Sequence, residues 1–310
     1  MQTILGAGGA IGNELAKALP AYTDKIRLVS RNPKKVNATD ELFAADVTKY
    51  EEVAKALEGA EVAYLTVGLP YNKKVWQRTW PVVMKNVIDA CKLHHTQLVF
   101  FDNIYLYDPS HLNPITEDTP ENPSSEKGKV RAQIAHMLWG AVAKNDIRAL
   151  IARSADFYGP SIKKSCMLTE TVFNPLSKHS KATWLGNPGY KHSFTYTPDA
   201  GRATALLGNT EDAYGQVWHL PTAPNPYTGK EWIQHIANEL GVAAKYRVAN
   251  KSLVKMLGIF MPIMRELVEM MYQYEQDYVF NSDKFEKRFS IKPTPYADGI
   301  KEIVKTDYLK

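Results

Sequence analysis

Short apolar runs alternate with helical patterns over the first half of the chain. The runs predict strands over residues 3–7, 26–30, 42–46, 61–67, 97–101 and 147–153. Apolar positions at helical spacing predict helices over residues 11–19, 50–59, 75–93 and 124–144. Strands that are apolar throughout, rather than at alternate positions, are typical of a parallel sheet buried on both faces. The order of elements therefore predicts an α/β fold with helices on both faces of a parallel sheet.

The second half of the chain has a different pattern. Proline and glycine are scattered through residues 156–230, and helical patterns return at 229–240 and 252–279. We therefore expect residues 1–160 to form the sheet domain and residues 161–310 to form a smaller mixed part. Some segments of this second part are expected to return to the sheet.

Composition and charge narrow the class of protein. The chain has 310 residues, of which 45% are hydrophobic and 23% are charged, as is ordinary for a soluble globular protein. The net charge of +5 is mild, and without a long Lys/Arg block we expect no nucleic-acid partner. Two cysteines, Cys91 and Cys166, and histidines without HExxH spacing predict neither a disulfide framework nor a metal site.

The distribution of apolar residues along the chain indicates the expected cellular compartment of the protein. No window approaches the run of about 18 apolar residues that a membrane span needs, so we expect no membrane partner. The first apolar run reaches a glycine turn too soon for a secretory signal, so the cytoplasm is the expected compartment.

The segment ILGAGGAIGNEL places Gly6, Gly9 and Gly12 between the first predicted strand and the first predicted helix. Gly6 and Gly9 can adopt backbone angles barred to other residues, and Gly12 permits close packing of the helix on the strand. The start of the helix then offers N–H groups to a pyrophosphate. We therefore predict a nucleotide site; the alternative is a packing turn without a ligand. The predicted contacts in this loop are Gly6, Gly8, Gly9, Ala10, Ile11 and Gly12.

The end of the second strand bears on the choice of nucleotide. An NAD site usually has an acidic residue there, whereas this chain has Ser30 and Arg31. Arg31 can pair with a 2′-phosphate and stack on adenine, which favours NADP over NAD. Asp46, after the third strand, can accept a hydrogen bond from the adenine amino group. The alternatives are a solvated Arg31 and an Asp46 that caps the next helix.

Several motifs together resemble the short-chain dehydrogenase/reductase superfamily, in its extended and atypical branches labelled NAD-dependent epimerase/dehydratase. They are GAGGAIG, ADVTKYEEVAKALEGAEVAYLTV, LIARSADFYGP, SFTYTPDAGRATALL and GKEWIQHIANELG, spread over nearly the whole chain. The resemblance implies a Rossmann-type doubly wound parallel sheet with a smaller, mixed C-terminal part that binds substrate. It also implies further cofactor contacts at Val47, Thr66, Val67, Gly68, Lys127, Arg153 and Phe157.

The resemblance also points to residues that contact the substrate. Tyr71, Tyr158, His192 and Tyr196 are the candidates, although residues of these types are often structural. Trp76 and Trp80, one helical turn apart, favour core packing over a wall of the site. A homodimer through helices 75–93 and 124–144 is expected by analogy with relatives.

The predicted catalytic residues depart from the pattern of the superfamily. The superfamily has Ser or Thr after the fifth strand and then Tyr-x-x-x-Lys on the next helix. Here FFDNIYLYDP puts Asn103 at the first position, and EKGKVRAQ puts Lys127 and Arg131 at the other two. This arrangement resembles an atypical subgroup and the isoflavone-reductase and pinoresinol-reductase group, in which a lysine is the proposed acid/base.

A helical wheel at about 100° per residue separates the cations of this segment. Lys127 and Arg131 fall on the apolar stripe, whereas Lys129 falls on the far side. A buried cation needs a partner, so we expect a cofactor ribose or phosphate, or a substrate oxygen, beside them. The alternative is a frayed stripe from which both side chains reach water.

A mechanism follows as a hypothesis. Arg131 hydrogen-bonds the nicotinamide ribose, Lys127 donates a proton to a carbonyl oxygen, and the Asn103 amide orients that oxygen. Tyr105 and Tyr107 are nearby phenols, and one of them is an alternative acid. The sequence therefore predicts an NAD(P)(H)-dependent oxidoreductase for a small carbonyl or hydroxyl substrate. The alternatives are an epimerase or dehydratase for a nucleotide sugar and a non-catalytic NADP-binding redox sensor.

Overall fold

The computed structural model describes residues 1–164 and 166–309. The chain forms two compact units, and each is built from separate stretches of sequence. Unit 1 comprises Met1–Leu106, Glu126–Ser154 and Pro198–Leu220. Unit 2 comprises Tyr107–Ser125, Ala155–Thr197 and Pro221–Lys310. The segment Pro198–Leu220 thus follows a long stretch of unit 2 but belongs to unit 1.

Unit 1 contains the predicted parallel sheet. In the described part of the chain it has seven strands in the order β10-β6-β5-β4-β1-β2-β3, and each pairs with its neighbours in parallel. The strands are β1 (Gln2–Leu5), β2 (Ile26–Ser30), β3 (Glu41–Ala44), β4 (Val62–Leu65), β5 (Gln97–Asp102), β6 (Ala149–Arg153) and β10 (Val217–His219). The carboxyl ends of parallel strands meet at one edge of the sheet, which gathers the residues that follow them.

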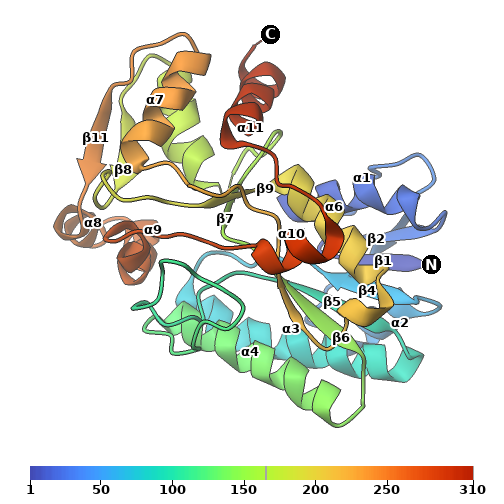
Figure 1. The fold of residues 1–310 in the computed structure, drawn as a ribbon. Helices are drawn as coiled ribbons and strands as arrows, with labels where there is room; N and C mark the ends of the chain where they lie inside the picture. The colour runs from blue at the N-terminus through green and yellow to red at the C-terminus, as the bar shows by residue number, and fades with distance from the viewer. Residues whose placement is uncertain (165, 310) are drawn as a thin grey trace. The chain divides into compact units, whose positions relative to one another are not determined.

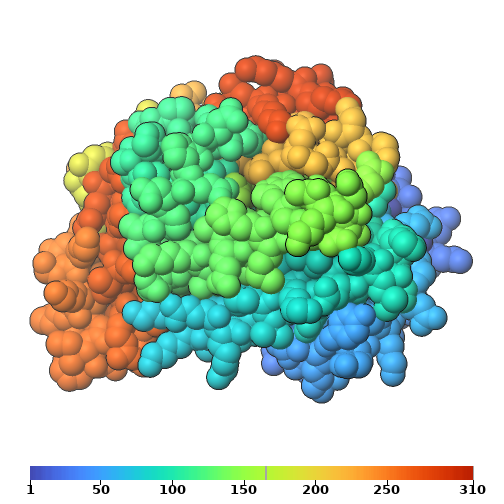
Figure 2. Space-filling model, turned by 90° about the horizontal axis from the view of Figure 1, so that it is seen from below, coloured from blue at the N-terminus to red at the C-terminus, as the bar shows by residue number. Residues whose placement is uncertain are grey.

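Helices cover both faces of this sheet (Figure 1). One face is covered by α2 (Tyr50–Leu57), α3 (Lys73–His94) and α4 (Glu126–Ala143), and α3 and α4 run side by side on the surface in Figure 2. Their apolar sides bury alternate strand residues, such as Leu65 and Phe100, in one core. The other face has α1 (Ala10–Ala18) and α6 (Thr197–Gly208). These observations confirm the doubly wound α/β fold.

The packing of α6 on α1 depends on a glycine. A Cβ atom at Gly201 would lie 2.6 Å from the backbone carbonyl carbon of Glu14, closer than such atoms approach. Only glycine therefore allows α6 to lie this close to α1. The short 3-10 helices η1 (Leu19–Ala21) and η3 (Glu211–Ala213) complete the regular structure of unit 1.

Unit 2 contains two small parallel strand pairs. β7 (Asp156–Tyr158) pairs with β9 (Phe194–Tyr196), and β8 (Ala182–Leu185) pairs with β11 (Tyr246–Ala249). Its helices are α5 (Asn174–Ser177), α7 (Gly229–Glu239), α8 (Lys251–Leu257), α9 (Pro262–Leu267), α10 (Asp283–Phe289) and α11 (Tyr296–Ile303). Its shorter helical turns are η2 (Thr169–Phe173), η4 (Val268–Tyr274) and η5 (Val304–Tyr308).

Residues 252–279, which have a helical pattern in the sequence, form separate helical elements rather than one helix. The chain there forms α8, a turn at residues 258–261, α9 and then η4. Pro262 occupies the first turn of α9, where its missing N–H is tolerated, whereas within a longer helix its ring would clash with the preceding turn. The predicted strand 3–7 is also too long, because Gly6 turns the chain with a φ of 105° directly after β1.

Candidate cofactor and catalytic sites

The glycine turn after β1 is built for close backbone approach. Gly6 and Gly8 adopt φ values of 105° and 92°, which favour glycine. A Cβ at Gly6 would lie 2.6 Å from the Val67 nitrogen, and one at Gly12 would lie 2.8 Å from the Gly6 oxygen. Side chains at Gly6 and Gly12 are therefore excluded, while a Cβ at Gly8 would meet only open space. This is the cradle that a pyrophosphate requires.

The start of α1 has the electrostatics of an anion site. Its N-cap is Gly9, which offers no side-chain cap, and its first turn contains no acidic residue. The first N–H groups of the helix, from Ala10 and Ile11 onward, thus face outward from the end of the helix without a competing carboxylate. Thr66, after β4, donates its hydroxyl to the Leu5 oxygen at 3.2 Å, which fixes the neighbouring loop that continues through Gly68.

The residues expected at the adenosine end lie after β2 and β3. Ser30 is the last residue of β2, and Arg31 is exposed. Asp46 accepts hydrogen bonds from the backbone and hydroxyl of Thr48 at 2.9 and 2.8 Å. These bonds lower the pKa of Asp46, and the positive charge of Arg31 acts in the same direction. The Asp46 carboxylate is thus held in a turn before α2, and the next residue, Val47, accepts a bond from Asn86 through its carbonyl.

A buried ionic cluster forms where β5, β6 and α4 converge. Arg131 donates from Nε to Asp102 Oδ1 at 2.7 Å and also from its terminal nitrogen to the same oxygen. Arg153 donates from Nε to Asp102 Oδ2 at 3.3 Å. All three side chains are buried. The guanidinium carbon of Arg131 also lies 4.5 Å from the Trp80 ring centroid, which adds a cation–π contact.

Arg131 has a protein partner that the sequence-based hypothesis did not include. We expected a cofactor ribose beside it, and its Nε and one terminal nitrogen donate to Asp102, a residue of the same unit. The reason is topological, because Asp102 ends β5 and Arg131 lies one turn into the helix that packs over it. Asp102 was not among the candidate residues. The signal that was available was an acidic residue at the end of an otherwise apolar strand.

Lys127 lies on the same face of α4 and is fully buried. Its Nζ lies 4.5 Å from the ring centroid of Tyr71. Lys129 is exposed and pairs with Glu126 at 2.6 Å. The helical wheel is therefore confirmed, and the alternative in which both inward cations fray to water is excluded.

Asn103 and Tyr105 follow β5 directly. The Asn103 N–H donates to Asp102 Oδ1 at 2.7 Å, and Asn103 Oδ1 accepts from the Tyr105 N–H at 3.0 Å. Because its carbonyl oxygen is engaged, the amide nitrogen of Asn103 is the end that can serve a ligand. The Tyr105 ring stacks on Trp76, with centroids 6.2 Å apart and planes 16° apart. Trp76 and Trp80 are buried in the core, as expected.

In unit 2, His192 belongs to an ordered aromatic stack. Its imidazole lies between the rings of Tyr274 and Tyr278, with centroids 4.5 and 4.4 Å away and planes within 13°. Nε2 of His192 lies 3.1 Å from Asp156 Oδ2, and the Tyr274 hydroxyl donates to that same oxygen at 3.1 Å. Among the described residues, Asp156 Oδ1 makes no hydrogen bond and the carboxylate is partly exposed. Sequence reasoning also missed Asp156, two residues before the Tyr-Gly-Pro motif.

The other candidates of unit 2 are packed in its interior. Tyr158 and Tyr196 are buried with ring centroids 5.3 Å apart, and Tyr158 also contacts Trp232 edge-on. The Phe157 carbonyl accepts from the Cys166 thiol at 3.2 Å. Burial raises the pKa of this thiol, which agrees with the expectation that Cys166 is a bystander.

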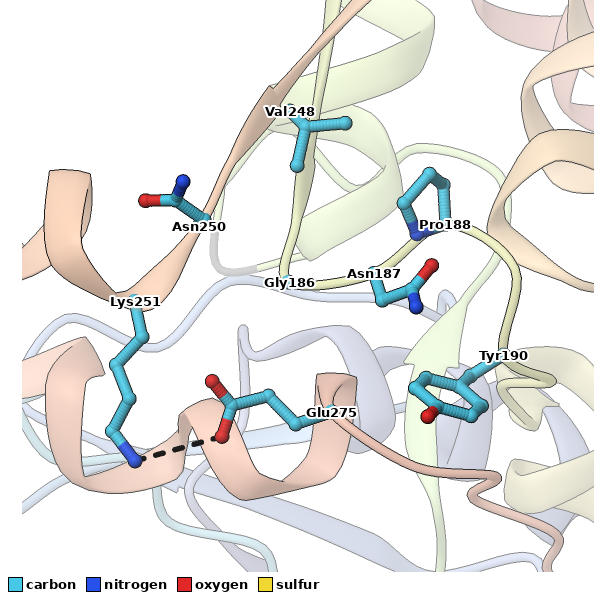
Figure 3. Close-up of a pocket in the computed structure, with 8 residues that line it drawn as sticks. All are labelled: Gly186, Asn187, Pro188, Tyr190, Val248, Asn250, Lys251 and Glu275. Carbon is cyan, nitrogen blue, oxygen red and sulfur yellow. Dashed lines mark ion pairs between the residues drawn. The ribbon is translucent and has the colours of Figure 1, made fainter.

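A hollow of about 440 Å³ lies elsewhere in unit 2 (Figure 3). Its lining residues are Gly186, Asn187, Pro188, Tyr190, Val248, Asn250, Lys251 and Glu275. Lys251 and Glu275 form an ion pair of 3.5 Å across it. None of the candidate catalytic or cofactor-binding residues lines this hollow. We therefore do not assign the reaction to it.

Two kinds of feature are absent from the residues that the structure describes. None of the helices there combines the length and the apolar character needed to cross a membrane. Nor do His, Cys, Asp and Glu side chains gather there in groups of three or more that could hold a metal ion.

The parallel sheet, the glycine turn and the uncapped start of α1 define a dinucleotide-binding α/β protein. A model of the NAD dependent epimerase/dehydratase family matches residues 3–219. The chain therefore belongs to this family, whose members are enzymes. A search of curated proteins finds no match.

Solved structures share the fold at low sequence identity. UDP-glucose 4-epimerase of Thermus thermophilus, solved with NAD, has 17% identity and a TM-score of 0.79, covering 99% of this chain and 98% of that chain. UDP-glucuronic acid 4-epimerase of Bacillus cereus, also with NAD, has 17% identity and a TM-score of 0.80, with the same coverage. DesIV of Streptomyces venezuelae, a dTDP-glucose 4,6-dehydratase, has 15% identity and a TM-score of 0.79, covering 98% and 96%. At these identities the likeness establishes the fold alone.

Proposed function

We propose that the protein is an NADP(H)-dependent oxidoreductase for a small carbonyl or hydroxyl substrate, with Lys127 as the acid/base. The observation that supports this most directly is the complete burial of Lys127 at the start of α4. A lysine ammonium on a buried helix face is costly to desolvate, so a chain retains it there for chemistry or for a specific partner.

The choice of cofactor follows from unit 1. The glycine turn and the start of α1 receive the pyrophosphate, and Arg31 receives the 2′-phosphate of NADP. NAD is the second candidate, because the family is described as NAD dependent and the neighbours above were solved with NAD. An exposed Arg31, with no acidic residue at the end of β2, is the feature that favours NADP.

Each candidate residue of unit 1 then has a separate role in the proposed reaction. When bound, the nicotinamide supplies or accepts a hydride. Lys127 donates a proton to the substrate oxygen as a carbonyl becomes an alcohol, and it takes the proton back in the reverse direction. Asn103 directs its amide nitrogen to the same oxygen. Tyr105 is the alternative acid.

Arg131 has a different role from the one its position in the motif implies. Its hydrogen bonds go to Asp102, and Asp102 in turn accepts the Asn103 N–H. Arg131 is therefore a positioning residue that holds the end of β5, and with it Asn103, against α4. Arg153 supports the same carboxylate from β6.

Within unit 1, Tyr71 is the proposed substrate contact, beside Lys127. Within unit 2, the His192–Asp156 pair is the proposed polar contact. The second oxygen of Asp156 accepts a hydroxyl or amine donor and repels an anionic group. This disfavours a nucleoside diphosphate at that point, although family membership keeps a nucleotide-sugar epimerase or dehydratase as the second candidate. Tyr158 and Tyr196, whose ring centroids lie 5.3 Å apart, are the further proposed substrate contacts of unit 2.

Turnover of purified protein with NADPH tests the proposal. The substrates are panels of aldehydes, ketones and enones, with nucleotide-diphosphate hexoses assayed in parallel for epimerisation. Lys127→Met is expected to lose at least about 100-fold in kcat while NADPH binding, followed by fluorescence, is retained. Lys129→Met, at the exposed position two residues away, is the matched control and should be unaffected.

Two outcomes would contradict the proposal. Full turnover by the Lys127→Met variant would remove the lysine from the mechanism and favour Tyr105. Tight NADPH binding without oxidation by any substrate of the panels would support the non-catalytic sensor instead.

A further inference from the structure

Unit 2 exposes an apolar turn between α8 and α9. Ile259 and Phe260 are 75% and 81% exposed, more than any other large hydrophobic residue among those described. The exposed apolar residues of this turn and of the adjoining ends of α8 and α9, here called the apolar tip, are Met256, Ile259, Phe260, Met261 and Ile263. The two short helices lie at the left of Figure 1 and in the orange region at the left edge of Figure 2.

Basic residues outnumber acidic ones around the apolar tip. Residues 247–265 contain four basic residues and no acidic one, and the acidic residues that follow are Glu266, Glu269 and Glu275, of which Glu266 is buried. These four, here called the basic collar, are Arg247, Lys251, Lys255 and Arg265. Lys251 pairs with Glu275 beside the hollow in Figure 3. Among the described residues, Lys255 and Arg265 form no ion pair, so their charges are available to an anionic partner.

The backbone of the turn is already satisfied by local hydrogen bonds. The N–H groups of Ile259, Phe260 and Met261 donate to Met256 and Leu257 carbonyls at 3.2, 3.1 and 2.8 Å. At Pro262 there is no N–H to satisfy. Insertion of the apolar tip into a non-aqueous medium would therefore expose few unpaired donors, which is the condition for entering lipid.

We propose that the apolar tip and the basic collar dock the protein on the surface of an anionic phospholipid membrane. The apolar side chains enter the acyl boundary, and the collar pairs with phosphate headgroups. A second copy of this chain fits less well, because five side chains on one turn provide far less than the roughly 800 Å² per partner of a stable interface. The proposal does not depend on the catalytic role of Lys127.

The test is flotation of the full-length protein with lipid vesicles. One set contains phosphatidylcholine alone, and the other contains phosphatidylcholine mixed with phosphatidylglycerol. We expect the protein to float with the anionic vesicles, and added salt to weaken this binding. NADPH binding by each variant checks that the chain is folded.

Two double variants separate the apolar and the ionic contributions. Ile259→Ser with Phe260→Ser is expected to lower the partition coefficient by about tenfold to 100-fold, since two large apolar side chains no longer insert. Lys255→Gln with Arg265→Gln should lower it by about fivefold per charge at low salt. Matched controls are Leu93→Ser, an exposed leucine of unit 1, and Lys301→Gln with Lys305→Gln, exposed lysines of unit 2; both should leave binding unchanged.

Three results would overturn the proposal. The first is no flotation with anionic vesicles, and the second is an equal loss in the control variants. The third is a dimer in analytical ultracentrifugation that the Ile259→Ser/Phe260→Ser variant converts to monomer, with vesicle binding unchanged. That third result would assign the apolar tip to contact between copies of the chain.

Discussion

Each unit contains a carboxylate surrounded by largely buried side chains, but the two are satisfied in different ways. In unit 1, Asp102 is buried and both of its oxygens accept from arginines. In unit 2, Asp156 uses only Oδ2, which His192 and Tyr274 approach, while its other oxygen has no partner among the described residues. Both oxygens of Asp102 therefore accept hydrogen bonds from the protein. Asp156 is held through one oxygen, and its other oxygen can accept a hydrogen bond from a ligand.

The difference shows how a buried charge can be interpreted. A carboxylate whose acceptors are all used stabilises the local structure and has nothing left for a ligand. A carboxylate that is fixed through one oxygen can present the other to a substrate at little entropic cost, because its partners already hold it. This difference supports the proposed division, in which Asp102 holds its neighbours in position and Asp156 contacts the substrate. The predictions below test this division.

The largest effect is expected for Asp102→Asn. The variant leaves the guanidinium of Arg131 buried without its counter-ion, which typically costs about 3–5 kcal/mol of unfolding free energy. Urea denaturation followed by circular dichroism measures the change. The control is Asp146→Asn, which breaks a surface pair with Lys92 and should cost about 1 kcal/mol or less. If the two variants lost the same unfolding free energy, the buried Asp102 would contribute no more to stability than a carboxylate in a surface ion pair, and the prediction would be wrong.

Arg131→Lys is expected to have the next largest effect. Lysine keeps the charge but loses the planar group that contacts Asp102 through two nitrogens and stacks on Trp80. A loss of about 1–3 kcal/mol in unfolding free energy is expected from the hydrogen bond and packing lost. If Arg131 positions Asn103 as proposed, kcat also falls while cofactor affinity is retained. An unchanged kcat in a folded variant would limit Arg131 to a structural role.

Asp156→Asn should separate binding from stability. The amide keeps an acceptor but loses the charge, so we expect KM for the preferred substrate to rise about tenfold, with about 1 kcal/mol or less lost in stability. Steady-state kinetics and urea denaturation provide both values. Asp283→Asn, at an exposed aspartate of the same unit, is the control. A large stability loss with unchanged KM would mean that Asp156 is a structural carboxylate like Asp102.

The smallest effect concerns Asp108, a partly buried carboxylate of unit 2. Hydrogen bonds from Ser110 and Asn122 lower its pKa from 3.8 to about 2. Because the folded pKa is depressed, its stabilising contribution is present above pH 3.8 and is lost as the pH falls towards 2. Unfolding curves of the wild type and Asp108→Asn should therefore differ by a constant amount near neutral pH and converge in acid. A difference that persists at pH 2 would contradict the assignment.

Much of unit 1 could be predicted from the sequence because its determinants are local. The apolar strands, the glycine turn and the stripe of α4 each lie within one short segment, and the burial of Lys127 followed from helical spacing alone. The partner of Arg131 could not be found in this way. It requires knowing that the ends of β5 and β6 meet beneath α4, which is a property of the sheet order.

Unit 2 was less predictable for the same physical reason. Asp156, His192 and Tyr274 come from three distant segments, and no spacing in the sequence links them. The break between α8 and α9 was locally encoded by Gly258 and Pro262, but the apolar periodicity of residues 252–279 concealed it. The exposure of Phe260 depends on that break, so the apolar tip was not foreseen, and the sequence led us to expect no membrane partner.

The return of Pro198–Leu220 to unit 1 has a consequence for the order of events during synthesis. β10 is the edge strand beside β6, and Gly201 brings α6 against α1, a helix made almost 200 residues earlier. The last strand of the sheet, β10, can therefore pair only after residue 219 has left the ribosome. Until then, the edge of β6 and one side of α1 are uncovered, and uncovered strand edges and apolar surface of this kind favour aggregation of a partly synthesised chain.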